Sequence, residues 1–214
     1  MKDTDQLLKR AEKIGVRLKP AQIEKLSLFV DMILEKGVKM GLSGRKNREE
    51  IYEKDILDSL FLAPYIPPLG KILDIGSGVG IPGIPLKIIF PDASFFLLDA
   101  KRKAALFLED AARVLSLTNL RIKQSRAEDI FDETFDLILG RAVAQAPHFL
   151  EVAHALLAQN GEIILQKGKK WDAEAGEAAP VLSRLNLRID GIVRGPLGEQ
   201  KLIFIKRNLR ECFT

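Results

Sequence analysis

The residues whose types and spacing point most directly to chemistry lie in the stretch 71–83, Lys-Ile-Leu-Asp-Ile-Gly-Ser-Gly-Val-Gly-Ile-Pro-Gly. Gly76, Gly78 and Gly80 interrupt a short apolar run that is typical of a buried parallel strand. A turn without Cβ atoms allows a ligand to contact the backbone. Pro82 suits the start of a following helix, where a missing N–H group is tolerated. A strand, a glycine turn and a helix in this order predict a nucleotide-type pocket at the carboxyl end of a parallel sheet.

Two ligands compete for this turn. The spacing Gly78-x-Gly80-x-x-Gly83 matches the dinucleotide fingerprint, and Asp99 follows Gly78 by 21 residues, where a ribose-binding acid is expected. This interpretation predicts a nicotinamide-dependent dehydrogenase.

Asp74 and Pro82 favour a different ligand. Asp74 ends the strand, where it would repel a pyrophosphate but suit the cationic ammonium or sulfonium of S-adenosylmethionine. Pro82 removes one of the N–H donors that a pyrophosphate would use at the helix start. Asp99 would then bond the ribose hydroxyls. We therefore predict a methyltransferase that uses S-adenosylmethionine as its cofactor.

The methyl acceptor decides which other groups the reaction needs, since methyl transfer is mainly a matter of positioning. Cys212, at the chain end, is badly placed for the nucleophile of cytosine C5 methylation. The stretch 136–143, Asp-Leu-Ile-Leu-Gly-Arg-Ala-Val, lacks the Asp/Asn-Pro-Pro-aromatic turn of exocyclic amine methylation. An acceptor with a free lone pair, such as guanine N7, needs no general base, and we expect none.

Further polar residues follow the predicted strands. Arg141 ends the fourth strand, where it would hold either the cofactor carboxylate or an RNA phosphate, or form a surface ion pair. Glu128 follows the third strand and either meets the adenine or is a solvated charge. Trp171 either stacks on a base or packs at a helix start. His148 and His154 are read as ordinary surface or packing residues, and no metal site is expected.

The stretch 36–48 is the most basic part of the chain, with five Lys or Arg, no acid and three glycines. We call it the basic loop. Its cations either contact phosphates or belong to a solvated connection, and the sequence favours neither. The candidates for RNA contact within it are Lys39, Arg45, Lys46 and Arg48.

Composition bounds the class of protein. The chain has 214 residues, 47% of them hydrophobic, a net charge of +4 and one cysteine. We expect a cytoplasmic protein without a membrane span, because no apolar run reaches the roughly 18 residues required. Positive charge gathers at the chain ends: residues 1–54 carry 13 Lys or Arg against 9 Asp or Glu. This distribution indicates a polyanionic partner.

Strand and helix patterns alternate after an all-helical start. Residues 1–68 predict an N-terminal helical cap, including a helix over 48–62 that Asn47 and Glu50 would cap. Residues 69–214 predict an α/β domain, a doubly wound, mostly parallel seven-stranded sheet of the Rossmann-like, class I methyltransferase kind. The predicted strands are 71–75, 94–98, 120–124, 135–139, 162–166, 188–194 and 201–206, the last two forming an antiparallel hairpin.

The chain resembles the glucose-inhibited division protein B family, the bacterial 16S rRNA guanine-N7 methyltransferases. The resemblance rests on motifs in the family's order: Ile-Leu-Asp-Ser at 56–59, the glycine turn with its continuation to Leu86, Leu-Asp at 98–99, Ser-Arg-Ala-Glu at 125–128, Gly-Arg-Ala at 140–142 and Lys-Gly at 167–168. It covers nearly the whole chain, and the Gly-Ile-Pro-Gly-Ile-Pro-Leu continuation is its most specific part.

The resemblance implies roles for residues. It implies methyl transfer to a guanine in the decoding-region loop of 16S rRNA, free or in a small ribosomal subunit precursor, and we expect a monomer. The implied cofactor contacts are Gly76, Gly78, Ile81, Asp99, Ala127, Glu128 and Arg141. The resemblance also implies that Lys103 and Lys167 contact RNA or substrate.

The chain departs from the family pattern on the expected RNA side. It has Lys54-Asp55 where the family usually has Arg-His, Arg102-Lys103-Ala104 where the family reads Gly-Lys-Arg, and Val143-Ala144-Gln145 in place of Phe-Ala-Ser. These changes leave the cofactor motif intact and keep another RNA guanine open as the acceptor. A non-catalytic RNA-binding protein and a dehydrogenase, against which Asp74 and Pro82 speak, are the remote alternatives.

Overall fold

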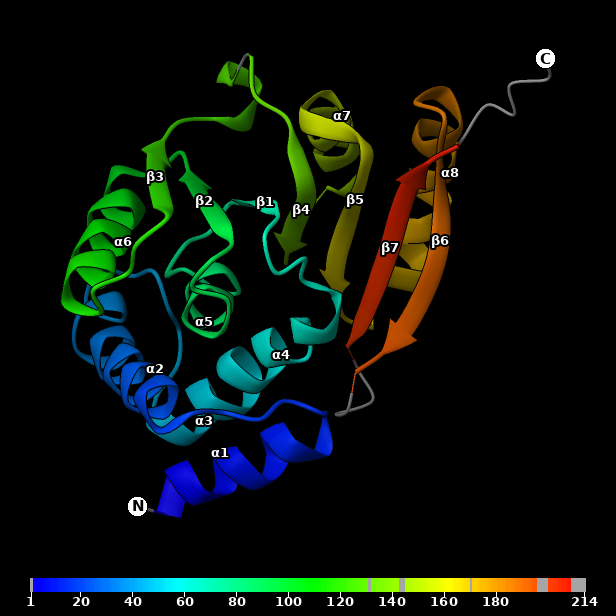
Figure 1. The fold of residues 1–214 in the computed structure, drawn as a ribbon. Helices are drawn as coiled ribbons and strands as arrows, with labels where there is room; N and C mark the ends of the chain where they lie inside the picture. The colour runs from blue at the N-terminus through cyan, green and yellow to red at the C-terminus, as the bar shows by residue number, and fades with distance from the viewer. Residues whose placement is uncertain (1, 131, 143–144, 170, 196–199, 209–214) are drawn as a thin grey trace. The chain divides into compact units, whose positions relative to one another are not determined.

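The computed structural model describes residues 2–130, 132–142, 145–169, 171–195 and 200–208. Its seven strands form a sheet in the order β3-β2-β1-β4-β5-β7-β6 (Figure 1). β1 pairs with β2, β2 with β3 and β4 with β5 in parallel, while β7 is antiparallel to both β5 and β6. The predicted sheet with its closing antiparallel pair is confirmed. The stretch 196–199, predicted as the hairpin turn, lies outside the described residues.

The chain divides into two compact units, Met1–Arg126 and Ala127–Thr214. This boundary differs from the predicted one at 68/69. The N-terminal helices contact the rest of the first unit: Gln22 Nε2, for example, donates to the carbonyl oxygens of Ile88 and Ile89 at 3.4 and 3.3 Å. They are thus part of this unit.

The first unit begins with helices. These are α1 (Lys2–Lys13), α2 (Pro20–Met32), the π-turn η1 (Ile33–Gly37), α3 (Arg48–Ile51), the π-turn η2 (Tyr52–Ile56), α4 (Leu57–Leu60) and the 3-10 turn η3 (Ala63–Tyr65). The helix predicted over 48–62 is thus three successive pieces that end at Leu60, and the Asn47 side chain accepts from Glu50 N–H at 2.9 Å as predicted. The π-turn in the middle has no signal in residue type that we can identify.

The three strands of this unit alternate with helices. They are β1 (Lys71–Ile75), α5 (Gly83–Ile89), β2 (Ser94–Asp99), α6 (Arg102–Val114) and β3 (Leu120–Gln124). Burial explains the pattern: Ile72 and Leu73 of β1 and Phe95 and Leu97 of β2 are almost wholly inaccessible. Strands buried on both faces read as continuous apolar runs, so the sequence located them well.

The second unit holds the 3-10 turn η4 (Ala127–Asp129), β4 (Phe135–Arg141), α7 (Ala146–Leu156), β5 (Leu157–Lys167), α8 (Trp171–Arg184), β6 (Leu187–Arg194) and β7 (Lys201–Arg207). β5 begins five residues earlier than predicted, because Leu157 already pairs with Phe135 before an irregularity in the ladder. Helix α7 correspondingly ends at Leu156, directly before β5.

Candidate functional site

The glycine turn between β1 and α5 has a left-handed backbone at three positions. Gly76, Gly78 and Gly80 have φ angles of +75°, +56° and +87°. Residues with a side chain rarely adopt these values, which cost a non-glycine residue roughly 1–2 kcal/mol. The backbone of this turn therefore requires glycine, beyond the room for a ligand that the sequence predicts.

The four glycines of the stretch 76–83 nevertheless have two different surroundings. A Cβ atom at Gly76 would meet nothing within 4 Å, and one at Gly78 would meet only the Gly76 carbonyl oxygen, at 4.0 Å. A Cβ at Gly80 would lie 2.4 Å from Ile84 Cγ1, and one at Gly83 2.3 Å from Leu97 Cδ2. Only Gly76 and Gly78 leave the backbone open to a ligand, whereas Gly80 and Gly83 allow close packing.

Asp99, at the end of β2, is tied to this turn. Its Oδ2 accepts from Gly78 N–H at 2.9 Å and its Oδ1 accepts from Lys101 N–H at 2.8 Å. The residue is half-buried. A carboxylate offers about four acceptor positions, so it can hold the turn and still accept from a ligand hydroxyl.

Ser77 is a residue of the turn that the sequence reasoning missed. It is 2% exposed, its hydroxyl donates to the Asp74 carbonyl oxygen at 2.8 Å, and its oxygen accepts from Leu98 N–H at 3.2 Å. The signal was present, because a serine between two glycines at a strand end can bond neighbouring backbone groups. Ser77 thus joins the ends of β1 and β2 beneath the open glycines.

Asp74, predicted to suit the cationic part of S-adenosylmethionine, bonds the start of α5. It is 1% exposed, and its Oδ2 accepts from Gly83 N–H, at the first residue of α5, at 3.1 Å. The carboxylate thus occupies the helix start that a pyrophosphate would need, which argues against a dinucleotide.

The remaining predicted cofactor residue of this unit is Ile81. It is 6% exposed, and its N–H donates to the Ser77 carbonyl oxygen at 3.2 Å. Its side chain is part of the core beneath the turn.

The second unit carries the other three predicted cofactor residues. Ala127 is buried in η4, and Glu128 beside it is exposed, with its Oε1 2.9 Å from Nε2 of His148 in the first turn of α7. His148 is thus a surface residue, as predicted, and pairs with another exposed side chain. Arg141 is the half-buried last residue of β4. Val143 lies outside the described residues, so its departure from the family pattern has no structural account.

In the basic loop, Arg45 and Arg48 bond within the protein. Arg45 Nε and Nη2 donate to the two carboxylate oxygens of Asp55 at 2.8 and 2.7 Å, and these hydrogen bonds raise the pKa of Arg45. Arg48 bonds Ser27 and Tyr52 and forms an ion pair with Asp31. Lys46 is exposed.

The two lysines implied by the resemblance also have protein partners. Lys103 Nζ donates to the Met40 carbonyl oxygen at 2.9 Å. Lys167 is 5% exposed, and its Nζ pairs with Glu174 at 2.6 Å. Trp171 is 2% exposed, which excludes stacking on a base. Because Lys167, Arg45 and Arg48 pair with carboxylates of the protein, we do not propose them as phosphate contacts.

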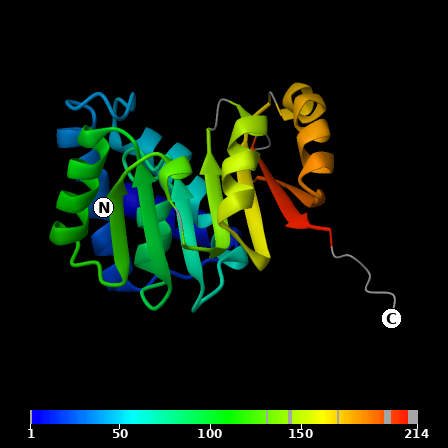
Figure 2. The ribbon, with the colours of Figure 1, turned by 90° about the horizontal axis from the view of Figure 1, so that it is seen from above.

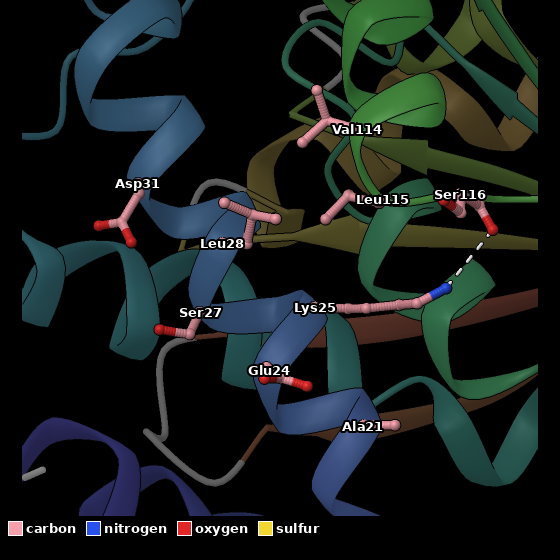
Figure 3. Close-up of a pocket in the computed structure, with 9 residues that line it drawn as sticks. All are labelled: Ala21, Glu24, Lys25, Ser27, Leu28, Asp31, Val114, Leu115 and Ser116. Carbon is pink, nitrogen blue, oxygen red and sulfur yellow. Dashed lines mark hydrogen bonds between the residues drawn. The ribbon is translucent and has the colours of Figure 1, made fainter.

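The described residues contain no group of three or more His, Cys, Asp or Glu side chains that could hold a metal ion, and no helix among them is long and apolar enough to cross a membrane. A surface hollow of about 500 Å³ lies between α2 and the end of α6, where Lys25 Nζ donates to the Ser116 carbonyl oxygen (Figure 3). None of its lining residues belongs to the glycine turn.

Comparison with known proteins adds a family to this geometry. The family model GidB, rRNA small subunit methyltransferase G, matches residues 22–193. The chain is similar to the ribosomal RNA small subunit methyltransferase G of Moorella thermoacetica, with 36% identity over 92% of this chain and 85% of that protein. It is 37% identical to the protein of the same name from Desulfitobacterium hafniense, over 88% and 81% of the two chains.

Solved structures share the fold at low identity. A SAM-dependent methyltransferase from Aquifex aeolicus has a TM-score of 0.62 at 16% identity, covering 79% of this chain and 97% of that one. M. jannaschii TYW2, solved in complex with AdoMet, has a TM-score of 0.59 at 14% identity, covering 73% and 77%.

Proposed function

Since the chain belongs to the GidB family of rRNA small subunit methyltransferases G, we propose that it methylates N7 of a guanine in the decoding-region loop of 16S rRNA. Whichever guanine is the acceptor, the chain is an S-adenosylmethionine-dependent methyltransferase of small-subunit rRNA. The observation that carries the proposal is the pair of open glycines, Gly76 and Gly78, beside the carboxylate of Asp99.

The residues of the first unit fit S-adenosylmethionine. Nothing lies within 4 Å of a Cβ built at Gly76, so the backbone there is accessible to a bulky ligand. Asp99 is already oriented by two backbone N–H groups, so a ribose would meet a carboxylate with little freedom left to lose. We assign Gly76, Gly78 and Asp99 to the cofactor.

The chemistry asks the protein mainly to position its ligands. When bound, S-adenosylmethionine supplies a methyl group on a sulfonium, an electrophile that needs no further activation. Guanine N7 carries a lone pair and no proton, so no side chain has to remove one. The chain's own work is therefore to orient, as Asp99 and the two open glycines do, and to hold the RNA.

The second unit holds the other residues that we propose as cofactor contacts. The family resemblance supports Ala127, Glu128 and Arg141 as further cofactor contacts, with Arg141 positioning rather than exchanging a proton. We also propose that the protein acts as a monomer in the cytoplasm, on free 16S rRNA or on a small-subunit precursor.

The test is mass spectrometric mapping of methylated guanines in 16S rRNA incubated with and without the protein and cofactor. We expect one 7-methylguanine in the decoding-region loop that depends on the protein. A methyl group on another guanine would move the acceptor, and affinity for RNA without any methyl transfer would favour the non-catalytic alternative.

An Arg141→Ala variant tests the second unit's part. We expect strongly reduced turnover with little change in melting temperature. Reduced stability with normal turnover per folded molecule would mean that Arg141 forms only a surface ion pair.

A further inference from the structure

The first half of the basic loop is fastened to α6. Lys103 Nζ, in the first turn of α6, donates to the Met40 carbonyl oxygen at 2.9 Å, and Lys36 Nζ bonds Asp110, two turns further along, at 2.5 Å. Figure 2 shows the loop, in blue, beside α6. Two separate bonds therefore hold this segment at a set place along the helix.

The same segment touches the glycine turn. Gly37 is buried, and a Cβ atom there would lie 3.2 Å from Val79 Cγ1 and 3.6 Å from Phe107 Cε2. Val79 stands between Gly78 and Gly80. The loop thus begins in direct contact with the turn to which we assign the cofactor.

Three cationic side chains around this contact have no partner among the described residues. The side chains of Lys39, Lys101 and Arg102 are exposed, and within the described part of the chain they form no hydrogen bond or ion pair. Lys39 precedes Met40, and Arg102 precedes Lys103, so the Lys103–Met40 bond brings the two segments together. Lys101 and Arg102 also follow Asp99 closely in the chain.

We propose that Lys39, Lys101 and Arg102, here named the cationic rim, contact the phosphates next to the methylated guanine. Lys36 and Lys103 are positioning residues that hold Lys39 in the rim. The inference rests on the proposed function, because it takes RNA as the partner. It differs from the sequence-based assignment, which named Arg45 and Arg48 and did not name Lys101 or Arg102.

Charge and hydration favour these three side chains. A phosphate contact releases counterions only if the cation is free to pair with the phosphate. Arg45 and Arg48 would first have to leave carboxylates within the protein. The rim residues lose only water, and their neighbour Asp99 binds the cofactor, so the phosphates they hold lie near the reacting base.

The experiment compares two double variants that remove the same charge from the first unit. Lys101→Ala with Arg102→Ala changes the rim. Lys13→Ala with Arg17→Ala changes two exposed cations near the end of α1 that also have no partner among the described residues. Binding of a 16S rRNA transcript is titrated with salt for both variants and the wild type, and melting temperatures confirm that all three fold.

We expect the rim variant to flatten the plot of log affinity against log salt by about 1.4, from about 0.7 for each single-strand phosphate contact. The Lys13/Arg17 variant should run parallel to the wild type. Equal flattening in both would mean that only net charge matters and would overturn the rim, as would parallel lines for all three proteins.

A double-variant cycle tests the positioning role. Lys39→Ala should flatten the slope by about 0.7 in the wild-type background and by clearly less once Lys103 is alanine, since the loop is then unfastened. Lys103→Arg keeps a donor for the Met40 carbonyl and should restore the Lys39 effect. An undiminished Lys39 effect in the Lys103→Ala background would remove Lys103 from this role.

Methyl transfer is measured on the same samples, so the two proposals can fail separately. Normal transfer by the wild type with parallel salt slopes would overturn the rim alone. The expected difference in slopes without any methyl transfer would support the rim and overturn the proposed function.

Discussion

The glycine turn, 76–83, and the basic loop, 36–48, lie against each other, yet the sequence describes them unequally well. In the turn, the predicted strand, glycine break and helix start are all present. In the loop, Arg45 and Arg48, for which the sequence left phosphate contact and a solvated position equally open, instead bond Asp55 and Asp31. Residue type was a good guide to backbone conformation and a poor guide to which charges are free.

The difference has a simple physical origin. A glycine is required by the φ angle of its own residue, which the local sequence already constrains. A cation's role depends on whether a carboxylate or carbonyl lies within about 3 Å of its charged group, and that partner can come from anywhere in the chain. Met40 and Lys103, for example, are 63 residues apart.

The largest expected effect comes from matched alanine substitutions in the turn. Gly80→Ala should lower the free energy of unfolding by roughly 3–4 kcal/mol, combining left-handed strain with overpacking against Ile84 and Leu108. Gly78→Ala carries only the strain, about 1 kcal/mol, but places a methyl group on the open side and should weaken S-adenosylmethionine binding at least tenfold. Chemical denaturation and calorimetry measure the two quantities.

If both variants lost the same stability and Gly78→Ala bound cofactor normally, the turn would be uniform and merely structural. The division of its glycines into open and packed pairs would then be wrong.

The second prediction concerns the loop. Arg45→Ala takes both charged hydrogen bonds from the buried carboxylate of Asp55 and should destabilise the protein by about 3 kcal/mol, as removal of one partner from a buried ion pair does. Lys46→Ala, next in the chain and exposed, should change stability little. Denaturation curves test this, and the salt slope of RNA binding should be unchanged for Arg45→Ala.

A flattened salt slope in Arg45→Ala with normal stability would contradict this prediction, because Arg45 would then contact a phosphate rather than stabilise Asp55.

The third prediction returns to the turn. Asp99→Asn keeps an acceptor for Gly78 N–H but loses the charge, so S-adenosylmethionine affinity should fall by about 2 kcal/mol with a smaller change in stability. Asp92→Asn, an exposed acid ahead of β2, is the matched control. Unchanged cofactor affinity by calorimetry would remove Asp99 from the site.

The smallest effect is expected where the loop is fastened to α6. Hydrogen bonds from Lys36, and then from Arg113, lower the pKa of Asp110 from its ordinary 3.8. A carboxyl group with a lowered pKa in the folded state adds stability above the pKa of the unfolded chain, and this is lost as the pH falls through the folded-state pKa. The wild type should therefore lose melting temperature more steeply below about pH 4 than Asp110→Asn does.

The matched control is Glu109→Gln, an exposed neighbour on the same helix with no partner among the described residues. An exposed pair contributes about 0–1 kcal/mol, so the difference between the acid limbs is small. Identical acid limbs for wild type and Asp110→Asn would mean that this bond does not hold the loop.

Local sequence patterns predicted the alternation of strands and helices, the antiparallel end of the sheet and a glycine turn after the first strand. Apolar runs such as Leu137-Ile138-Leu139 and glycines such as Gly76 carry their structural requirement within a few residues. The same local reasoning indicated Asp99 as a ribose-binding acid beside the turn, and its bond to Gly78 N–H places it there.

Which of these groups are open depended instead on the tertiary structure. The fold buries Asp74 against the start of α5, fills the space beside Gly80 with Leu108, pairs Arg45 with Asp55 and leaves the Lys101 side chain without a partner among the described residues. Burial and pairing depend on atoms brought together from distant parts of the chain. A residue's neighbours in sequence therefore specify the conformation of its backbone, whereas its neighbours in space determine whether its side chain is available to a ligand.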